Sequence, residues 1–262
     1  MVRMRLDQLL VQRGLAESRA RAQALIMAGL VFSGERRLDK PGMPMAADAA
    51  LAVKGRDHPW VSRGGVKLAH ALDHFDIDPA ALVCLDVGAS TGGFTDVLLS
   101  RDAARVYAVD VGRGQLAWKL RIDARVILVE RVNVRHLTRA LIPEPIDLIV
   151  CDVSFISLTL ALPAAVALAA PGARLIALVK PQFEAGPAQV GKGGIVRDPD
   201  VRREVCRRIS AWVAAQPGWR VSGLIESPIT GADGNHEYLL AAVHATSGEP
   251  TSLRRSTVSP PA

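Results

Sequence analysis

The sequence predicts an α/β protein with a doubly wound sheet, preceded by a small α+β module. From residue 62 to about residue 245, apolar segments typical of strands alternate with segments typical of helices, which is the pattern of a doubly wound sheet. Residues 1–57 instead contain two short helical segments and two short strand-like segments. We interpret residues 58–61 as a linker, and residues 246–262, rich in Ser, Thr and Pro, as a disordered tail.

Composition restricts the class of protein. The chain has 262 residues, of which 49% are hydrophobic, enough for one α/β domain and a small extra module. Its three cysteines are far apart and form neither a disulfide framework nor a metal-binding CxxC spacing, so we expect a reducing compartment and no metal. The longest apolar run, residues 155–170, is too short and too broken to span a bilayer, and the first residues lack the pattern of a signal peptide. We therefore expect a cytoplasmic protein without a membrane partner, and the net charge of +6 favours a polyanionic partner.

The N-terminal module combines two predicted helices with two predicted strands. Four leucines between residues 6 and 15 predict a first helix that Gly14 ends, and Ser18 caps a second helix over residues 19–28. Strands are predicted at residues 30–32 and 51–53. The module carries ten Lys or Arg against six Asp or Glu. Two short helices and a hairpin with this excess of positive charge suit docking on structured RNA, although each arginine taken singly is more typical of a solvated surface.

The most informative segment of the larger module is a strand, a glycine-rich turn, a helix and a second strand. Residues 83–87 form a short apolar strand, residues 88–93 a turn that lets a ligand approach the backbone closely, and residues 94–99 a helix. The next strand, residues 105–109, is followed by Asp110. An acid about 20 residues beyond such glycines normally holds ribose hydroxyls, so this segment predicts a nucleoside cofactor.

The spacing of the glycines favours one cofactor. Dinucleotide-binding enzymes use Gly-x-Gly-x-x-Gly, whereas this chain has Asp-x-Gly-x-x-x-Gly-Gly, which suits S-adenosylmethionine and disfavours a dehydrogenase that uses NAD. The segment therefore predicts a methyltransferase core; the alternative is a glycine turn that serves only strand-to-helix packing. The predicted cofactor-binding residues are Asp86, Gly88, Ala89, Ser90, Gly92, Gly93, Phe94, Asp110 and Val111.

The remaining elements follow in order along the chain. Further strands are predicted at residues 126–129, 146–151, 174–179, 220–225 and 238–243. Helices are predicted at residues 65–75, 115–120, 158–169 and 199–215.

Charged residues stand at the ends of these strands. Asp152 follows the strand at residues 146–151, and Lys180 follows the strand at residues 174–179. Ligands of an open α/β sheet bind outside the carboxyl ends of its strands, so two such charges favour a site, although one alone could mark where the chain reaches water. Glu237 precedes the last strand and Lys67 lies at the start of the helix at residues 65–75.

The N-terminal pattern resembles an S4 RNA-binding domain. The resemblance rests on RLD at residues 5–7, RGL at 13–15, SR at 18–19 and GLV at 29–31, followed by Gly34 and by KP at 40–41. RLD is also a signature of pseudouridine synthases, but here it lies inside the S4 pattern and no synthase domain follows. The resemblance implies RNA binding, for which the candidate residues are Arg3, Arg13, Arg19, Lys40 and, beyond the module, Arg63.

The charged residues of the larger module also carry a resemblance. In the order Lys67, Asp152, Lys180 and Glu237 they resemble the Lys-Asp-Lys-Glu tetrad of RNA ribose 2′-O-methyltransferases with the FtsJ-like fold. Together with the S4 pattern and the segments DVGASTGGF, CDVSFISL, LVKPQFE and GNHEY, they make the chain similar to the TlyA family from residue 3 to about residue 243. These are S4-fused rRNA cytidine-2′-O-methyltransferases, some of which are called hemolysins. One departure is His58-Pro59 before Trp60, where the family commonly has Arg-Ala.

The family resemblance implies a reaction and a role for each tetrad residue. S-adenosylmethionine is the implied methyl donor, and a ribose of 16S or 23S rRNA in ribosomal subunits is the implied acceptor. Lys180 is expected to contact the 2′-oxygen, either accepting its proton or stabilising the oxyanion, and Asp152 to orient Lys180. Lys67 and Glu237 are expected to position the ribose. The alternatives are an RNA-binding protein with an inactive methyltransferase fold, and a membrane-active hemolysin.

Overall fold

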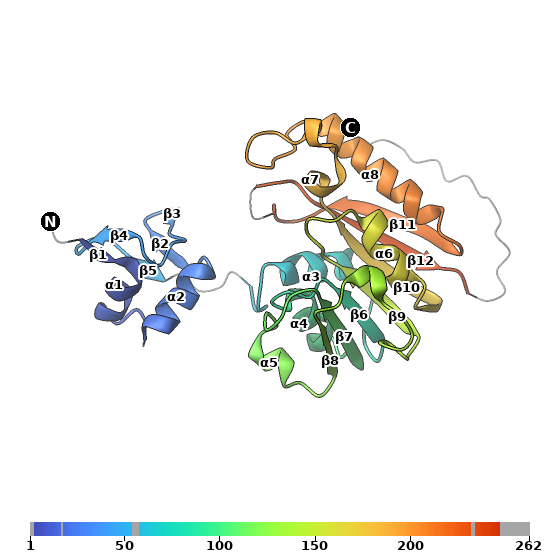
Figure 1. The fold of residues 1–262 in the computed structure, drawn as a ribbon, viewed down its shortest axis with the longest axis horizontal. Helices are drawn as coiled ribbons and strands as arrows, with labels where there is room; N and C mark the ends of the chain where they lie inside the picture. The colour runs from blue at the N-terminus through green and yellow to red at the C-terminus, as the bar shows by residue number, and fades with distance from the viewer. Residues whose placement is uncertain (1–2, 17, 54–57, 232–233, 247–262) are drawn as a thin grey trace. The chain divides into compact units, whose positions relative to one another are not determined.

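The structure, a computed structural model, describes residues 3–16, 18–53, 58–231 and 234–246, and within them the chain forms two compact units that divide between Pro59 and Trp60 (Figure 1). The division falls inside the linker predicted at residues 58–61. Residues 247–262 of the predicted tail and residues 54–57 at the end of the predicted module lie outside the described residues.

The N-terminal unit is a small α+β module, as predicted. Its elements are β1 (Arg3–Arg5), α1 (Leu6–Gln12), α2 (Arg19–Met27), β2 (Val31–Ser33), β3 (Arg36–Arg37), β4 (Pro44–Ala46) and β5 (Ala52–Val53). Strand β1 pairs with β4, and β2 pairs with both β3 and β5, all antiparallel. Leu6, Leu10, Ile26 and Val31 form its core. The predicted cap of the second helix is confirmed, since the Ser18 hydroxyl accepts a hydrogen bond from the backbone N–H of Arg21 at 3.1 Å.

The larger unit is a doubly wound α/β domain, which confirms the predicted fold class. Its strands are β6 (Val83–Val87), β7 (Arg105–Asp110), β8 (Val126–Glu130), β9 (Ile146–Cys151), β10 (Ala169–Val179), β11 (Trp219–Glu226) and β12 (Tyr238–His244). Its helices are α3 (Gly64–His74), α4 (Gly93–Ser100), α5 (Trp118–Arg121), α6 (Leu158–Val166), α7 (Pro181–Glu184) and α8 (Pro199–Ala214). Within the described residues these strands form one sheet in the order β11-β12-β10-β9-β6-β7-β8, in which β12 runs antiparallel to its neighbours.

Two apolar layers cover the two faces of this sheet. Alternate residues of β9 enter different layers: Ile149 and Cys151 pack with α6 and α8, whereas Leu148 and Val150 pack with α3 and α4 (Figure 1). A strand buried on both faces is typical of a parallel sheet. Burial on both faces fixes the position of the central strands β6 and β9 along the sheet, and therefore fixes where these strands end.

Two predicted helix boundaries are wrong. The helix predicted at residues 158–169 ends at Val166, because β10 already begins at Ala169. Pro171 and Gly172 lie where the register of β10 against β9 shifts, and neither residue is typical of a strand. The helix predicted at residues 115–120 is reduced to α5, because the backbone N–H of Ala117 donates to the carbonyl of Thr91 at 3.1 Å and holds the preceding segment against the glycine turn.

The sheet register brings the predicted site residues to one edge. Val87 of β6 lies between Val109 and Cys151 of its neighbours, so Gly88, Asp110 and Asp152 follow at the same level. On β10, Val179 lies opposite Tyr238 of β12.

Candidate active site

Asp152 and Lys180 form an ion pair at the carboxyl edge of the sheet. Lys180 Nζ lies 2.6 Å from Asp152 Oδ1 and donates a hydrogen bond to the hydroxyl of Ser154 at 3.0 Å. It also lies 5.8 Å from the centre of the Phe183 ring, a distance suited to a cation–π contact. The ammonium group therefore has an acid, a hydroxyl and an aromatic face around it.

Lys67 and Glu237 form a second ion pair next to the first. Lys67 Nζ donates to Glu237 Oε2, and both residues are buried, with exposed fractions of 8% and 3%. Because Val179 lies opposite Tyr238, the residues that adjoin them, Lys180 and Glu237, come from neighbouring strand ends. The structure thus brings the four predicted tetrad residues together as two cations paired with two carboxylates. Buried charges are tolerated when they are paired in this way.

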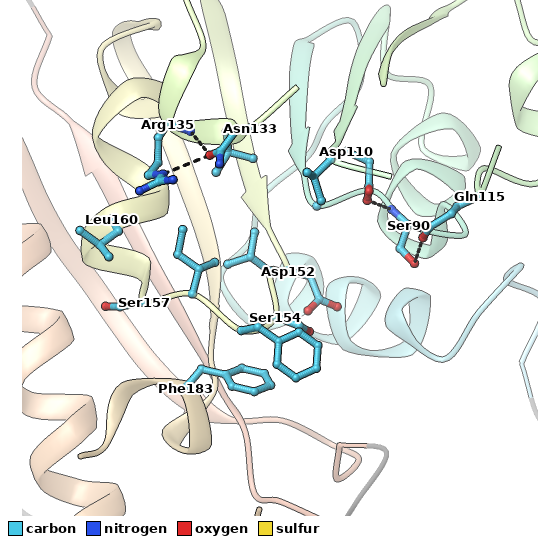
Figure 2. Close-up of a pocket in the computed structure, with 16 residues that line it drawn as sticks. Ser90, Asp110, Gln115, Asn133, Arg135, Asp152, Ser154, Ser157, Leu160 and Phe183 are labelled. Carbon is cyan, nitrogen blue, oxygen red and sulfur yellow. Dashed lines mark hydrogen bonds between the residues drawn. The ribbon is translucent and has the colours of Figure 1, made fainter. Parts of the chain in front are cut away.

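A cavity of about 830 Å³ opens beside the Asp152–Lys180 pair. Figure 2 shows Ser90 and Asp110 on one side of it, Asn133 and Arg135 on another, and Asp152 and Ser154 between them and Phe183. Four of the predicted cofactor-binding residues line this cavity: Gly88, Ser90, Asp110 and Val111.

The glycine turn forms one wall of the cavity. Gly88 has φ +86°, and a Cβ atom there would lie 2.6 Å from the carbonyl oxygen of Asp152, so a side chain at this position would collide with the end of β9. Asp110 holds the turn from the next strand: its carboxylate accepts hydrogen bonds from the backbone N–H groups of Ser90 at 2.8 Å and Gly112 at 2.6 Å. Asp110 therefore positions the turn as well as facing the cavity.

The other predicted cofactor residues do not line the cavity. The residues outside the cavity lining are Asp86, Ala89, Gly92, Gly93 and Phe94. Asp86 is fully buried and accepts a hydrogen bond from the Thr95 hydroxyl at 2.6 Å, while its Oδ1 atom has no hydrogen-bond partner among the described residues. Burial raises the pKa of Asp86 from 3.8 to about 7.

Several residues around the cavity were not predicted from the sequence. Asn133 and Arg135 follow β8, and the Asn133 side chain accepts hydrogen bonds from the backbone and side chain of Arg135 at 3.1 and 3.2 Å. Phe155 is 90% exposed and its ring centre lies 5.0 Å from that of Phe183. The signal that could have found Asn133 and Arg135 is the one that found Asp152, namely a polar residue just beyond the carboxyl end of a strand.

Glu184 fixes the loop that follows Asp152. Its carboxylate accepts hydrogen bonds from the Ser157 hydroxyl and from the backbone N–H of Leu158, both at 2.7 Å, so it ties α7 to the first turn of α6. Glu184 is buried, and this burial raises the pKa of its carboxyl group. The two segments that supply Asp152 and Lys180 are thereby joined.

The predicted RNA-binding residues fall into two groups. Arg3 and Lys40 are exposed in the N-terminal unit. Arg13 donates to the carbonyl oxygens of Ala47 and Ala49, Arg19 pairs with Asp7 at 3.0 Å, and Arg63 donates to the carbonyl of Thr230 at 2.9 Å. These contacts fix the direction of each of the three guanidinium groups.

Asp7 is buried at the centre of the N-terminal unit and belongs to its framework. It accepts hydrogen bonds from the side chains of Arg5, Arg19 and Gln23 at 2.9 to 3.1 Å, and the Arg5 guanidinium in particular lowers the pKa of its carboxyl group. A fully paired buried acid orients the two arginines beside it, which agrees with setting aside the pseudouridine synthase interpretation of RLD.

The described part of the chain contains neither a membrane-spanning helix nor a metal-binding group of side chains. In residues 3–16, 18–53, 58–231 and 234–246 no helix has the length and apolar character needed to cross a membrane. Nor do the described His, Cys, Asp and Glu side chains form a group of three or more that could hold a metal ion.

Comparisons with known proteins assign the two units. The FtsJ-like methyltransferase family model matches residues 60–244, and the S4 domain model matches residues 4–47. The 16S/23S rRNA (cytidine-2′-O)-methyltransferase TlyA of Mycobacterium tuberculosis is 49% identical over 91% of this chain and 89% of its own length. Hemolysin A of Brachyspira hyodysenteriae is 40% identical over 90% of this chain and 98% of its own. A solved structure from Streptococcus thermophilus, provisionally named a hemolysin, is 43% identical with a TM-score of 0.73, covering 94% of this chain and 90% of that one.

The fold and these matches define an S-adenosylmethionine-dependent methyltransferase that carries an S4 domain. The chain belongs to the FtsJ-like methyltransferase family, in the S4-fused group that includes TlyA and hemolysin A. The predicted family, fold class and cofactor are confirmed. The cavity fits this cofactor, because it has the size of a small-molecule site and the carboxylate of Asp110 faces it.

Proposed function

We propose that this protein transfers a methyl group from S-adenosylmethionine to the 2′-hydroxyl of a cytidine in ribosomal RNA. The observation that carries the proposal is the pairing of Lys180 with Asp152, and of Lys67 with Glu237, at the strand ends beside the cofactor cavity. The names of the relatives support the acceptor, since one that is 49% identical is named for cytidines of 16S and 23S rRNA. A ribosomal acceptor would place the activity in the cytoplasm.

The tetrad supplies what a ribose hydroxyl needs in order to react. The bound cofactor supplies an electrophilic methyl group, and the hydroxyl is a poor nucleophile until its proton leaves. Lys180, held by Asp152 and Ser154, contacts the 2′-oxygen and either takes the proton or stabilises the negative charge that develops on it. Lys67 and Glu237 hold the ribose. Fixing the hydroxyl in line with the methyl group lowers the entropic part of the barrier.

The remaining predicted residues divide between the cofactor and the RNA. Gly88, Ser90, Asp110 and Val111 hold the cofactor from the cavity wall, with Asp110 accepting hydrogen bonds from the ribose hydroxyls. The other predicted residues support the shape of the turn without lining the cavity: Asp86, Ala89, Gly92, Gly93 and Phe94. We assign RNA recognition to the S4 unit, predicted at residues 1–57, and methyl transfer to residues 62–245.

The test is to map 2′-O-methylated nucleotides on 16S and 23S rRNA from cells with and without this protein. We expect one or more cytidines to lose the modification when the protein is absent, and to regain it with the wild-type gene but not with Lys180→Ala. Purified protein should also transfer labelled methyl groups from S-adenosylmethionine to unmodified ribosomal subunits. Identical methylation maps in the two strains would rule the proposed function out.

A further inference from the structure

A glycine-rich hairpin lies between α7 and α8, after the segment that begins with Lys180 (Figure 1). The backbone N–H of Gly191 donates to the carbonyl of Ile195 and the N–H of Gly194 donates to the carbonyl of Gly191, both at 3.0 Å. Gly193 and Gly194 have φ values of +81° and +74°, which glycine adopts without strain. The result is a tight hairpin whose exposed tip carries Lys192.

The buried side chain of Asn235 holds this hairpin at its base. Asn235 is 2% exposed; its Oδ1 accepts a hydrogen bond from the backbone N–H of Val196 at 3.0 Å, and its Nδ2 donates to the carbonyl of Gly194 at 2.9 Å. The oxygen and the nitrogen of the amide therefore both bond to the backbone of residues 194–196, about 40 residues earlier in the sequence. Removing such a side chain would leave two backbone groups without partners, so this contact fixes the hairpin in place.

Asn235 also adjoins the tetrad. It stands two residues before Glu237, which in extended chain is a separation of roughly 7 Å. Its backbone carbonyl accepts a hydrogen bond from the N–H of Gly231 at 2.8 Å, and a Cβ atom on Gly231 would lie 2.5 Å from Glu237 Oε1. Asn235 therefore holds the hairpin through its side chain, and through its backbone carbonyl it holds Gly231, which packs against Glu237.

The hairpin offers positive charge on a surface with little side-chain bulk. Lys192 and Arg197 are both exposed, and a Cβ atom on Gly191 would lie 3.1 Å from Arg197 Nη1, so the guanidinium group lies over the hairpin. The nearest acid in sequence, Asp198, accepts a hydrogen bond from the backbone N–H of Asp200 at 2.8 Å and caps α8. Glycines beside two cations allow a phosphodiester backbone to approach the protein closely.

We propose that the hairpin of residues 191–195, held by Asn235, binds the phosphodiester backbone of the substrate RNA through Lys192 next to the tetrad. This inference rests on the proposed function, because it takes RNA as the acceptor. Asn235 acts as a positioning residue: it touches no reacting atom and places Lys192 relative to Glu237. The hairpin orients the strand whose ribose enters the tetrad.

The first test replaces Lys192 and compares it with a matched control. Arg220 is an exposed cation on β11 opposite Val243, at the end of that strand remote from the Glu226–Tyr238 pairing. Binding of ribosomal subunits is measured over a range of KCl concentrations for the wild type, Lys192→Ala and Arg220→Ala. For Lys192→Ala we expect a dissociation constant raised roughly threefold to tenfold and a slope of log K against log salt reduced by about 1. Arg220→Ala should match the wild type, and a Lys192→Ala variant that also matched it would overturn the proposal.

The second test asks whether Asn235 acts through the hairpin. Asn235→Ala should weaken RNA binding about as much as Lys192→Ala, and the double variant should be no weaker than Asn235→Ala alone, because both changes remove the same contact. Asn235→Asp keeps an acceptor for the Val196 N–H and should bind RNA more tightly than Asn235→Ala. Affinity for S-adenosylmethionine, measured by calorimetry, should be unchanged in all of them. Additive losses in the double variant would show that Asn235 does not act through Lys192.

These tests remain separate from the test of the proposed function. If the wild type bound subunits but methylated no cytidine, the proposed function would fail, while the salt dependence of Lys192→Ala would still decide whether the hairpin binds RNA. If Asn235→Ala did not fold, Asn235→Asp and Lys192→Ala would carry the result.

Discussion

Lys180 has three different partners within reach of its ammonium group, and each constrains it differently. Asp152 supplies a charge at 2.6 Å, Ser154 accepts a hydrogen bond at 3.0 Å, and the Phe183 ring lies 5.8 Å away. Removing one partner of a buried ion pair leaves the other charge without compensation. Variants that keep the charge therefore separate chemistry from folding better than alanine does.

Replacing Lys180 tests its role in methyl transfer. Lys180→Ala should slow single-turnover transfer from saturating S-adenosylmethionine to ribosomal subunits by roughly 100-fold or more, because a positioned acid–base or electrostatic group is lost. Lys180→Arg keeps the positive charge but cannot act as a base at neutral pH. Substantial activity in Lys180→Arg would favour stabilisation of the oxyanion over proton abstraction. Wild-type rates in both Lys180→Ala and Asp152→Ala would contradict the tetrad assignment.

Asp86 should make stability depend on pH. Burial raises its pKa from 3.8 to about 7, so the folded protein holds the proton more tightly than the unfolded chain does. The resulting stabilisation is complete below about pH 4 and is lost as the pH rises to about 7. Asp86→Asn removes this titration and keeps an acceptor for the Thr95 hydroxyl.

The free energy of unfolding is measured by urea denaturation without cofactor at several pH values between 4 and 8. Relative to Asp86→Asn, the wild type should lose about 1.4 kcal/mol per pH unit between its unfolded and folded pKa values. Stability curves of the two proteins that run parallel over this range would show that Asp86 does not titrate there.

The turn between β6 and α4 combines a backbone requirement with a steric one. Gly88 has φ +86°, and a Cβ atom there would lie 2.6 Å from the carbonyl oxygen of Asp152. Gly114 has φ +71°, but a Cβ atom there would have no other atom within 4 Å. Gly114→Ala therefore carries the conformational strain alone, about 1–2 kcal/mol. Gly88→Ala adds a collision with β9.

We expect Gly88→Ala to be less stable than Gly114→Ala and to bind S-adenosylmethionine at least tenfold more weakly than the wild type, because the turn must shift away from Asp152. Thermal unfolding and calorimetric titration with the cofactor measure the two effects. Equal losses in both variants would mean that the turn has room to relax, and that the close approach of Gly88 to β9 does not shape the cavity.

The elements predicted well from the sequence are those whose pattern reflects burial. Strands β6, β7 and β9 were predicted within one residue because their apolar runs fill both layers of the core. Strands β1 and β3 were missed, since Arg3–Arg5 and Arg36–Arg37 are short and largely exposed and carry no apolar alternation. Helix α7 was missed because its four residues follow Lys180 too closely to show a period.

The site residues likewise divide into those that a local sequence pattern reveals and those that it does not. Asp152 and Lys180 were found because a charge directly after an apolar strand is visible in sequence. Glu184 and Asn235 were not assigned roles, because their partners, Leu158 for one and Val196 for the other, lie 26 and 39 residues away. Contacts of this kind depend on the tertiary fold, and no local pattern reports them.

At the scale of the whole molecule, the two compact units imply a division of labour. The cavity and the tetrad are built entirely from residues after Pro59, and the S4 match lies within residues 4–47. The N-terminal core, which includes Leu6, Leu10, Ile26 and Val31, contains residues of the N-terminal unit alone. Loss of the N-terminal unit should therefore leave the cofactor site intact and remove a large part of the RNA contact.

Deleting residues 1–57 tests this division. The truncated protein should bind S-adenosylmethionine with unchanged affinity in calorimetry, because residues that line the cavity all remain. Its methylation of ribosomal subunits should become undetectable. The contacts around a single ribose give the larger unit little affinity for RNA, whereas the S4 unit adds phosphate contacts that raise this affinity steeply at low salt. Loss of cofactor binding would show that the larger unit does not fold alone. Full activity on subunits would mean that residues after Pro59 recognise the RNA unaided, and the S4 unit would then need a different role.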